Sequence, residues 1–151
     1  MKRFEFSLQR VLEYKNHLEK REKDILRDMR LRHQKLCAEM DDLIKKYQIY
    51  GKICDEKCAS GIEIRDLGPI KNHMSELRRR MNYYLIMIEK SEREIDRQVS
   101  CVIGISREKN TIEKLKQKHF TLYQKEEQKE TESFIEDFVA NAKSSGDLRV
   151  V

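Results

Sequence analysis

Four cysteines and four histidines are the side chains that could bind a metal or act as nucleophiles. Cys54 and Cys58 stand four residues apart, a spacing that could supply half of a zinc site. A structural zinc needs four ligands, and no second close pair or neighbouring histidine completes the set. The sequence therefore predicts no metal and no other cofactor. The remaining candidates are scattered, at Cys37, Cys101, His17, His33, His73 and His119.

Catalytic motifs are missing from the sequence as well. It has no glycine-rich phosphate loop, no His-Glu-x-x-His pair, and no serine or cysteine beside a placed base. His119 falls in an apolar stripe, where we interpret it as a packed spacer rather than a general base. We expect a protein that is not an enzyme.

The basic run Arg78-Arg79-Arg80 raises the question of nucleic-acid binding. Three consecutive helical residues point in three directions, and acids follow at Glu89 and Glu92. A basic-region helix needs a longer cluster that leads out of a parallel zipper. We therefore expect no nucleic acid and interpret the run as a solvated face, with an acidic protein surface as the alternative partner.

Tyrosines gather at Tyr47, Tyr50, Tyr83 and Tyr84. One interpretation is that Tyr47, Tyr50 and Tyr84 are wide residues of a helix–helix seam. The other is that two helices are too thin to cover these rings, which suit a protein interface because one end of a tyrosine tolerates water. Both interpretations stay open from the residues alone.

The composition is typical of a long helix pair. Of the 151 residues, 39% are charged and 38% hydrophobic, with one proline and five glycines. Disorder is the competing interpretation of so much charge, but the net charge is only +5 and the apolar residues recur at regular intervals. We expect one coiled-coil domain over 1–151.

Apolar residues recur at alternating steps of three and four, which is the pattern of a coiled-coil seam. It predicts a helix over about 5–58, a turn over 59–68, a helix over 69–142 that begins with Pro69, and a frayed tail over 143–151. The extra four-residue step from Arg32 through Leu36 to Met40 predicts a stutter. The first stripe is Leu8, Val11, Leu18, Ile25, Met29, Leu36, Met40, Leu43, Tyr47, Tyr50 and Cys54. The second is Ile70, Met74, Leu77, Met81, Tyr84, Ile88, Ile95, Val99, Val102, Ile112, Leu115, His119 and Leu122.

The two stripes fit one antiparallel register. Leu43 with Tyr84, and Ile25 with Val102, have residue numbers that add up to 127 in each pair. A constant sum near 127 predicts an all-α, long antiparallel two-helix coiled-coil hairpin whose second helix is longer than the first.

The same register leaves the end of the second helix without a partner. Residue 4 pairs with about residue 123, so 124–142 form an overhang. Its positions 124–140 hold two lysines and six acids, a net charge of −4. We expect its apolar face to bind another protein through Phe134, Ile135, Phe138 and Val139. The alternative is a frayed piece of helix that packs loosely on itself or on a second copy of the chain.

No apolar run approaches the roughly 20 residues of a membrane helix, and the first ten residues do not form a signal peptide. We therefore expect a cytoplasmic protein with reduced cysteines and no direct membrane insertion. It would reach the cell membrane only through a partner.

The opening Met1 to Lys15 resembles the start of the flagellar FliJ family, which has a basic residue, Phe-x-Phe, a small residue, Leu-Gln and then Val-Leu. The matching residues are Phe4, Phe6, Leu8, Gln9, Val11 and Leu12. This resemblance implies a component of the flagellar type III export apparatus, peripheral on the cytoplasmic side of the membrane through the basal body. It implies a central stalk in the ring of the export ATPase FliI that also contacts the export gate FlhA and export chaperones.

The resemblance also implies a partner-binding patch near the hairpin tip. Leu43, Tyr50, Leu77 and Tyr84 match its apolar and aromatic positions, and Tyr47 lies beside them, whereas Lys46 and Arg80 depart from the pattern. We call Leu43, Tyr47, Tyr50, Leu77 and Tyr84 the tip patch. The alternative functions are a generic coiled-coil tether or scaffold, or the stalk of an injectisome.

Overall fold

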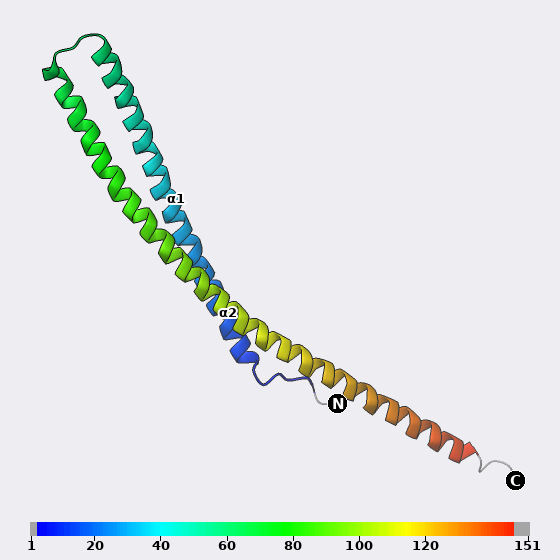
Figure 1. The fold of residues 1–151 in the computed structure, drawn as a ribbon. Helices are drawn as coiled ribbons and strands as arrows, with labels where there is room; N and C mark the ends of the chain where they lie inside the picture. Colours follow the sequence, from blue (N-terminus) through cyan, green and yellow to red (C-terminus); the bar gives the residue numbers. More distant parts are fainter. Residues whose placement is uncertain (1–2, 147–151) are drawn as a thin grey trace. The chain divides into compact units, whose positions relative to one another are not determined.

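The computed structural model describes residues 3–146, with side chains described as far as residue 141. Within this range the chain forms helix α1, Gln9–Ala59, and helix α2, Ile64–Gly146. A short loop joins the end of α1 to the start of α2 (Figure 1). The all-α hairpin with a longer second helix is thus confirmed, and no helix in the described range is long and apolar enough to cross a membrane.

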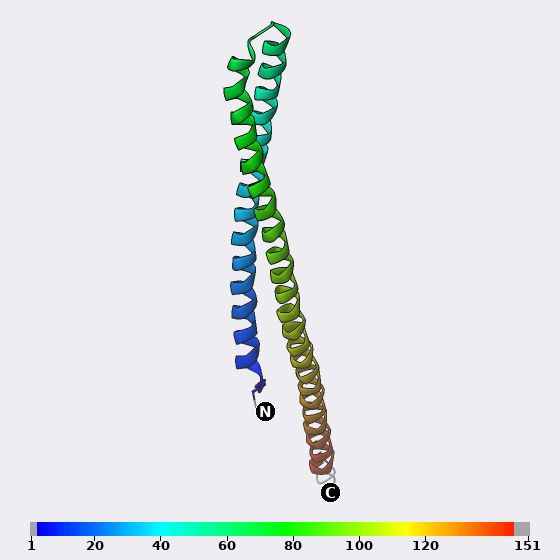
Figure 2. The same cartoon turned by 60° about the vertical axis from the view of Figure 1, so that its left-hand side comes forward.

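The chain divides into two compact units, and each helix contributes to both. The tip unit is Glu19–Gly104, and the open-end unit combines Met1–Leu18 with Ile105–Val151. In the tip unit the two helices lie side by side in both views (Figures 1 and 2). The expectation of a single domain over the whole chain stays a prediction.

Helix α1 begins at Gln9 rather than at residue 5, because the chain before it is extended. The Gln9 amide donates to the Phe6 carbonyl at 3.0 Å, and the first helical hydrogen bond runs from Leu12 to Leu8, also at 3.0 Å. Phe6 is buried, with 8% of its surface exposed. An extended segment places this ring against α2, and a helix starting at residue 5 would turn it elsewhere.

The end of α1 is closed by Gly61. Its φ of +80° lies in the left-handed region, where only glycine is unstrained. The Gly61 amide donates to the Cys58 carbonyl at 3.3 Å, and the Ile62 amide donates to the Lys57 carbonyl at 3.4 Å. This pair of bonds is a Schellman motif, which satisfies carbonyls that the last helical turn leaves unpaired.

Helix α2 starts at Ile64, so the prediction that Pro69 opens it was wrong. Leu67 and Ile70 are both half-buried and lie three residues apart, which places them on one face of a helix. Packing of that face extends the helix back through Pro69. The proline removes one backbone hydrogen bond near the exposed helix start, where water can satisfy the freed carbonyl. The helix also continues beyond residue 142 to Gly146, and residues 147–151 of the expected tail lie outside the described residues.

The seam of α1 runs without a stutter, so that prediction was also wrong. Its half-buried and buried positions alternate by four and three from Leu8 to Cys54, and include Leu12, Glu19 and Leu26. Val11 and Ile25, which we assigned to the seam, are 41% and 40% exposed at its flank. The misassignment arose because apolar side chains beside the seam masked the true position of the buried, charged Glu19.

The register differs from the expected one, because the residue numbers of contacting pairs at the tip add up to less than 127. Residue numbers add up to 125 for Tyr47 and Arg78, which share a hydrogen bond, and to 123 for Tyr50 and His73, whose rings are in contact. The rings of Phe4 and Tyr123 are in contact, and their residue numbers have the expected sum of 127. The reason is the early start of α2, which shortens the loop and moves the centre of the hairpin towards residue 62.

Candidate partner-binding surfaces

The two leucines of the tip patch form the core of the tip unit. Leu43 and Leu77 are 4% and 2% exposed, which makes Leu77 the most deeply buried large side chain among the described residues. Each buried leucine stabilises the helix pair by roughly 1.5–3 kcal/mol. A partner cannot touch them without opening the seam, so their contribution to any binding surface is to hold the tyrosines in place.

Tyr47 and Tyr50 of the tip patch each contact a residue of α2. The Arg78 guanidinium donates to the Tyr47 hydroxyl at 2.7 Å and lies 5.8 Å from the centre of that ring. Tyr50 packs on His73 with ring centres 4.3 Å apart. Both tyrosines are half-buried, so the structure supports the seam interpretation and leaves part of each ring at the surface.

Tyr84 is fixed by a hydrogen bond with the Glu39 carboxylate across the seam. This bond, followed by burial, raises the pKa of Tyr84 above its ordinary value. Its ring meets Tyr83 edge to face at 5.8 Å. Tyr83 is 59% exposed. Ile86 and Ile49, which are close in sequence to residues of the tip patch, are 65% and 56% exposed. A search for seam periodicity misses these residues because they lie off the stripe.

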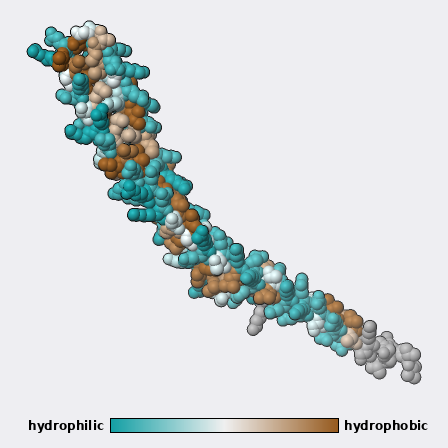
Figure 3. All heavy atoms as spheres, in the orientation of Figure 1, coloured by the Kyte–Doolittle hydropathy of each residue, from teal (hydrophilic) through white to brown (hydrophobic). Residues whose placement is uncertain are grey.

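The overhang has no cover from α1. Every residue from 128 to 141 is exposed. Phe134 and Phe138 are 71% and 67% exposed, and Ile135 and Val139 are 55% and 45% exposed. An apolar patch is visible on α2 close to its C-terminal end (Figure 3). The geometry confirms that the register leaves this segment unpaired within the hairpin, whereas its binding to another protein stays a prediction.

The open-end unit is closed by an aromatic cluster that the sequence reasoning missed. Phe4 packs on Phe120 and Tyr123 with ring centres 5.2 and 5.6 Å apart, and Phe6 meets His119 at 5.9 Å. The spacing Phe-x-Phe was the available signal, because alternate residues of an extended segment point to one side. The cluster ties the chain before α1 to α2.

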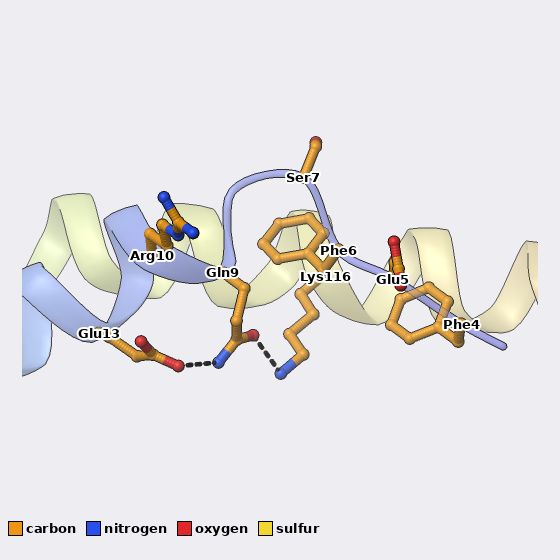
Figure 4. A pocket seen from close by; sticks show the side chains of 8 residues that line it. All are labelled: Phe4, Glu5, Phe6, Ser7, Gln9, Arg10, Glu13 and Lys116. Carbon is orange, nitrogen blue, oxygen red and sulfur yellow. Dashed lines mark hydrogen bonds between the residues drawn. The ribbon is translucent and has the colours of Figure 1, made fainter.

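A groove of about 580 Å³ lies beside this cluster, between the segment before α1 and Lys116 of α2 (Figure 4). The Lys116 ammonium donates to the side-chain oxygen of Gln9 at 2.8 Å. The side-chain amide nitrogen of Gln9 donates to the Glu13 carboxylate at 2.9 Å. These bonds join Lys116, Gln9 and Glu13 along one side of the groove, and the polar residues Glu5, Ser7 and Arg10 line the rest of it.

Polar residues interrupt the seam between the cluster and the tip. Gln98 donates to the Glu22 carboxylate at 2.8 Å and to its carbonyl at 3.1 Å. The Gln98 bond, followed by Arg21, lowers the pKa of Glu22 below its ordinary value. Lys15 pairs with Glu108 further along. Lys15 and Glu22 are half-buried positions of the seam, and their partners on α2 could not be identified from the sequence.

The cysteines and histidines stay dispersed along the helices. Within residues 3–141 no three metal-binding side chains gather. His33 and Cys37 approach each other at 3.5 Å on one helix face. Burial, followed by the neighbouring Cys58, raises the pKa of Cys54 above its ordinary value.

Comparison with known proteins gives one finding. A family model described as "Flagellar FliJ protein" matches residues 4–140, which is most of the chain and includes both the tip patch and the apolar residues of the overhang. No curated protein and no solved structure matches the chain.

Proposed function

Because the chain belongs to the flagellar FliJ family, and is thus a flagellar export-related protein, we propose that its overhang docks into the ring of the export ATPase FliI as a central stalk. The tip patch contacts the export gate FlhA, and the hairpin also meets export chaperones. The protein works on the cytoplasmic side of the membrane, held at the basal body by these partners. The observation that carries the proposal is the exposure of four large apolar side chains on the overhang.

The overhang has the properties of a docking helix. Phe134 and Phe138 are four residues apart and therefore lie on one helical face, and Ile135 and Val139 adjoin them. An isolated helix of this length is marginal in water, so a partner that covers the face also stabilises the helix. The six acids among residues 124–140 favour a basic cavity and make association sensitive to salt.

The free energy gained by burying the two phenylalanine rings is sufficient for specific binding. Burying one large apolar side chain contributes about 1.5–3 kcal/mol. Phe134 and Phe138 are 71% and 67% exposed, so most of this contribution is still available to a partner. Two such rings together change a dissociation constant by roughly 10²- to 10⁴-fold.

The tip patch supports a second docking point by its tyrosines. Tyr50 and Tyr84 come from different helices and are held by His73 and Glu39. A partner that contacts both rings binds both helices at once, so its binding requires the folded hairpin. Rigid aromatic rings lose little conformational freedom on binding, which suits them to such a contact.

Truncation after Tyr123 tests the stalk assignment. The shortened chain keeps the aromatic cluster of Phe4, Phe120 and Tyr123 and the whole tip unit. It should therefore melt as cooperatively as the full chain while failing to stimulate the export ATPase. Stimulation equal to that of the full chain, with the same melting profile, would show that the overhang is not the docking element.

A further inference from the structure

The outward face of α2 in the tip unit carries a line of residues at alternating steps of four and three. All six side chains are exposed, four are cationic, and no acid interrupts the line. The line consists of Arg79, Tyr83, Ile86, Lys90, Arg93 and Arg97. We call these residues the basic ridge.

The ridge faces away from α1. Met81, Tyr84 and Ile88 are half-buried in the seam. At 100° per residue, the ridge lies about 160° around the helix from them, and it extends for about 27 Å along the axis. It is therefore the convex side of a single helix, available to a partner over its whole length.

The acids beside the ridge do not neutralise it. Arg79 pairs with Glu76 at 3.4 Å and Arg93 with Glu89 at 3.7 Å, and all four side chains are more than half exposed. Exposed pairs of this kind contribute little and exchange readily for a stronger anion. The outward face of α1 differs, because there Lys45 and Lys52 alternate with acids such as Asp42 and Glu56.

Two apolar side chains stand in the middle of the ridge. Tyr83 is 59% exposed and Ile86 is 65% exposed. The Tyr83 ring is supported from one side by Tyr84, with ring centres 5.8 Å apart. Cations flank these two residues at both ends, an order that suits the boundary between lipid headgroups and acyl chains, where tyrosine is enriched.

We propose that the basic ridge binds the surface of an anionic phospholipid bilayer, with Arg79, Lys90, Arg93 and Arg97 on headgroup phosphates and with Tyr83 and Ile86 at the headgroup level. A broad anionic surface can meet a line of exposed side chains on the outward face of a single helix without a groove to enclose it. An acidic helix would instead need a groove, and a duplex would need cations that follow its curved backbone. The helix lies on the membrane and does not enter it.

The expected strength follows from the charge. Each lysine or arginine near an anionic membrane strengthens binding by roughly fivefold. The four cations of the ridge together give several-hundred-fold tighter binding to anionic than to neutral lipid, and salt weakens it because exposed charges are screened.

Co-sedimentation of the full chain with vesicles tests this proposal without any export protein. Vesicles of phosphatidylglycerol mixed with phosphatidylcholine should bind the chain, and vesicles of phosphatidylcholine alone should not. Replacing Arg79, Lys90, Arg93 and Arg97 by glutamine should weaken binding at least 100-fold. Replacing Tyr83 and Ile86 by serine should weaken it roughly tenfold while leaving the salt dependence unchanged.

The matched control removes the same charge from exposed lysines of α1, with Lys20, Lys35, Lys45 and Lys52 replaced by glutamine. It should lose less than tenfold. Equal losses in both quadruple variants would overturn the proposal, because net charge and not the ridge would then govern binding. Binding to polyglutamate without binding to either vesicle would overturn it too, by showing that the ridge recognises acidic protein.

Discussion

Leu26 and Ile25 are adjacent apolar residues, but only Leu26 is buried in the seam. Replacing each of them by alanine tests which residue the seam runs through. Leu26 is 8% exposed and Ile25 is 40% exposed. Three carbons are removed from Leu26 at about 0.8 kcal/mol each, so Leu26→Ala should destabilise the protein by about 2–3 kcal/mol once the small cavity is included. Ile25→Ala should cost only about 1 kcal/mol, because the side chain is partly solvated and alanine favours the helix.

Urea unfolding followed by circular dichroism measures both changes from the shift in midpoint at constant slope. The pair Leu12 and Val11 repeats the comparison in the open-end unit, with exposures of 6% and 41%. The reasoning would be refuted by an Ile25→Ala variant that loses as much stability as Leu26→Ala, because the seam would then run through Ile25, with a stutter further along.

Three further predictions concern the turn, the polar seam and the tip. Gly61→Ala should destabilise the hairpin by about 1 kcal/mol or more because φ at this position is +80°, and thermal melting measures the loss. The lowered pKa of Glu22 means that its contribution to stability is present above the ordinary glutamate pKa and is lost as pH falls through the lower, folded value. Gln98→Ala should therefore flatten the acid limb of a plot of stability against pH, and an unchanged limb would count against the Gln98 contact as its cause. Replacing Tyr50 and Tyr84 together by alanine should reduce swimming more than helix content, whereas loss of all folded protein would show that these rings serve only as core.

The fold was predictable where the apolar repeat is strong and the flanking positions are polar. In α2 the stripe from Ile70 to Ile88 fixes one face, and its counterpart around Leu43 fixes the antiparallel pairing. In α1 the apolar repeat predicted the wrong seam residues where the buried Glu19 lies next to the apolar Leu18. Burial is decided there by which face meets α2, and side-chain type alone does not contain that information.

Tertiary packing also overrode local rules at both ends of the hairpin. Proline favours the first helical position, yet α2 starts before Pro69 because Leu67 and Ile70 gain contacts on one face. Phe6 and His119 pack together although Phe6 precedes α1 and belongs to no apolar repeat. Such contacts join residues more than 100 positions apart, which a single-sequence pattern cannot pair.

The overhang was predictable because it follows from counting residues on each side of the turn. Its exposure needs no side-chain detail, and Phe134 and Phe138 are exposed as the register requires. The tip patch was less predictable, since Leu43 and Leu77 match a family pattern of binding residues but lie in the core. Their exposure depends on which faces of the two helices meet.

The most direct test of the account is a binding titration of the FliI ring with a variant that carries Phe134→Ser and Phe138→Ser, compared with Leu122→Ser as the matched control. Leu122 is 58% exposed and lies just before the overhang, so its replacement removes exposed apolar surface outside the proposed docking face. The double variant should lose affinity by roughly 10²-fold or more. The control should bind almost as tightly as the unaltered chain, and both variants should melt as the unaltered chain does. Equal affinities for the double variant and the unaltered chain would contradict the claim that the overhang is the docking element.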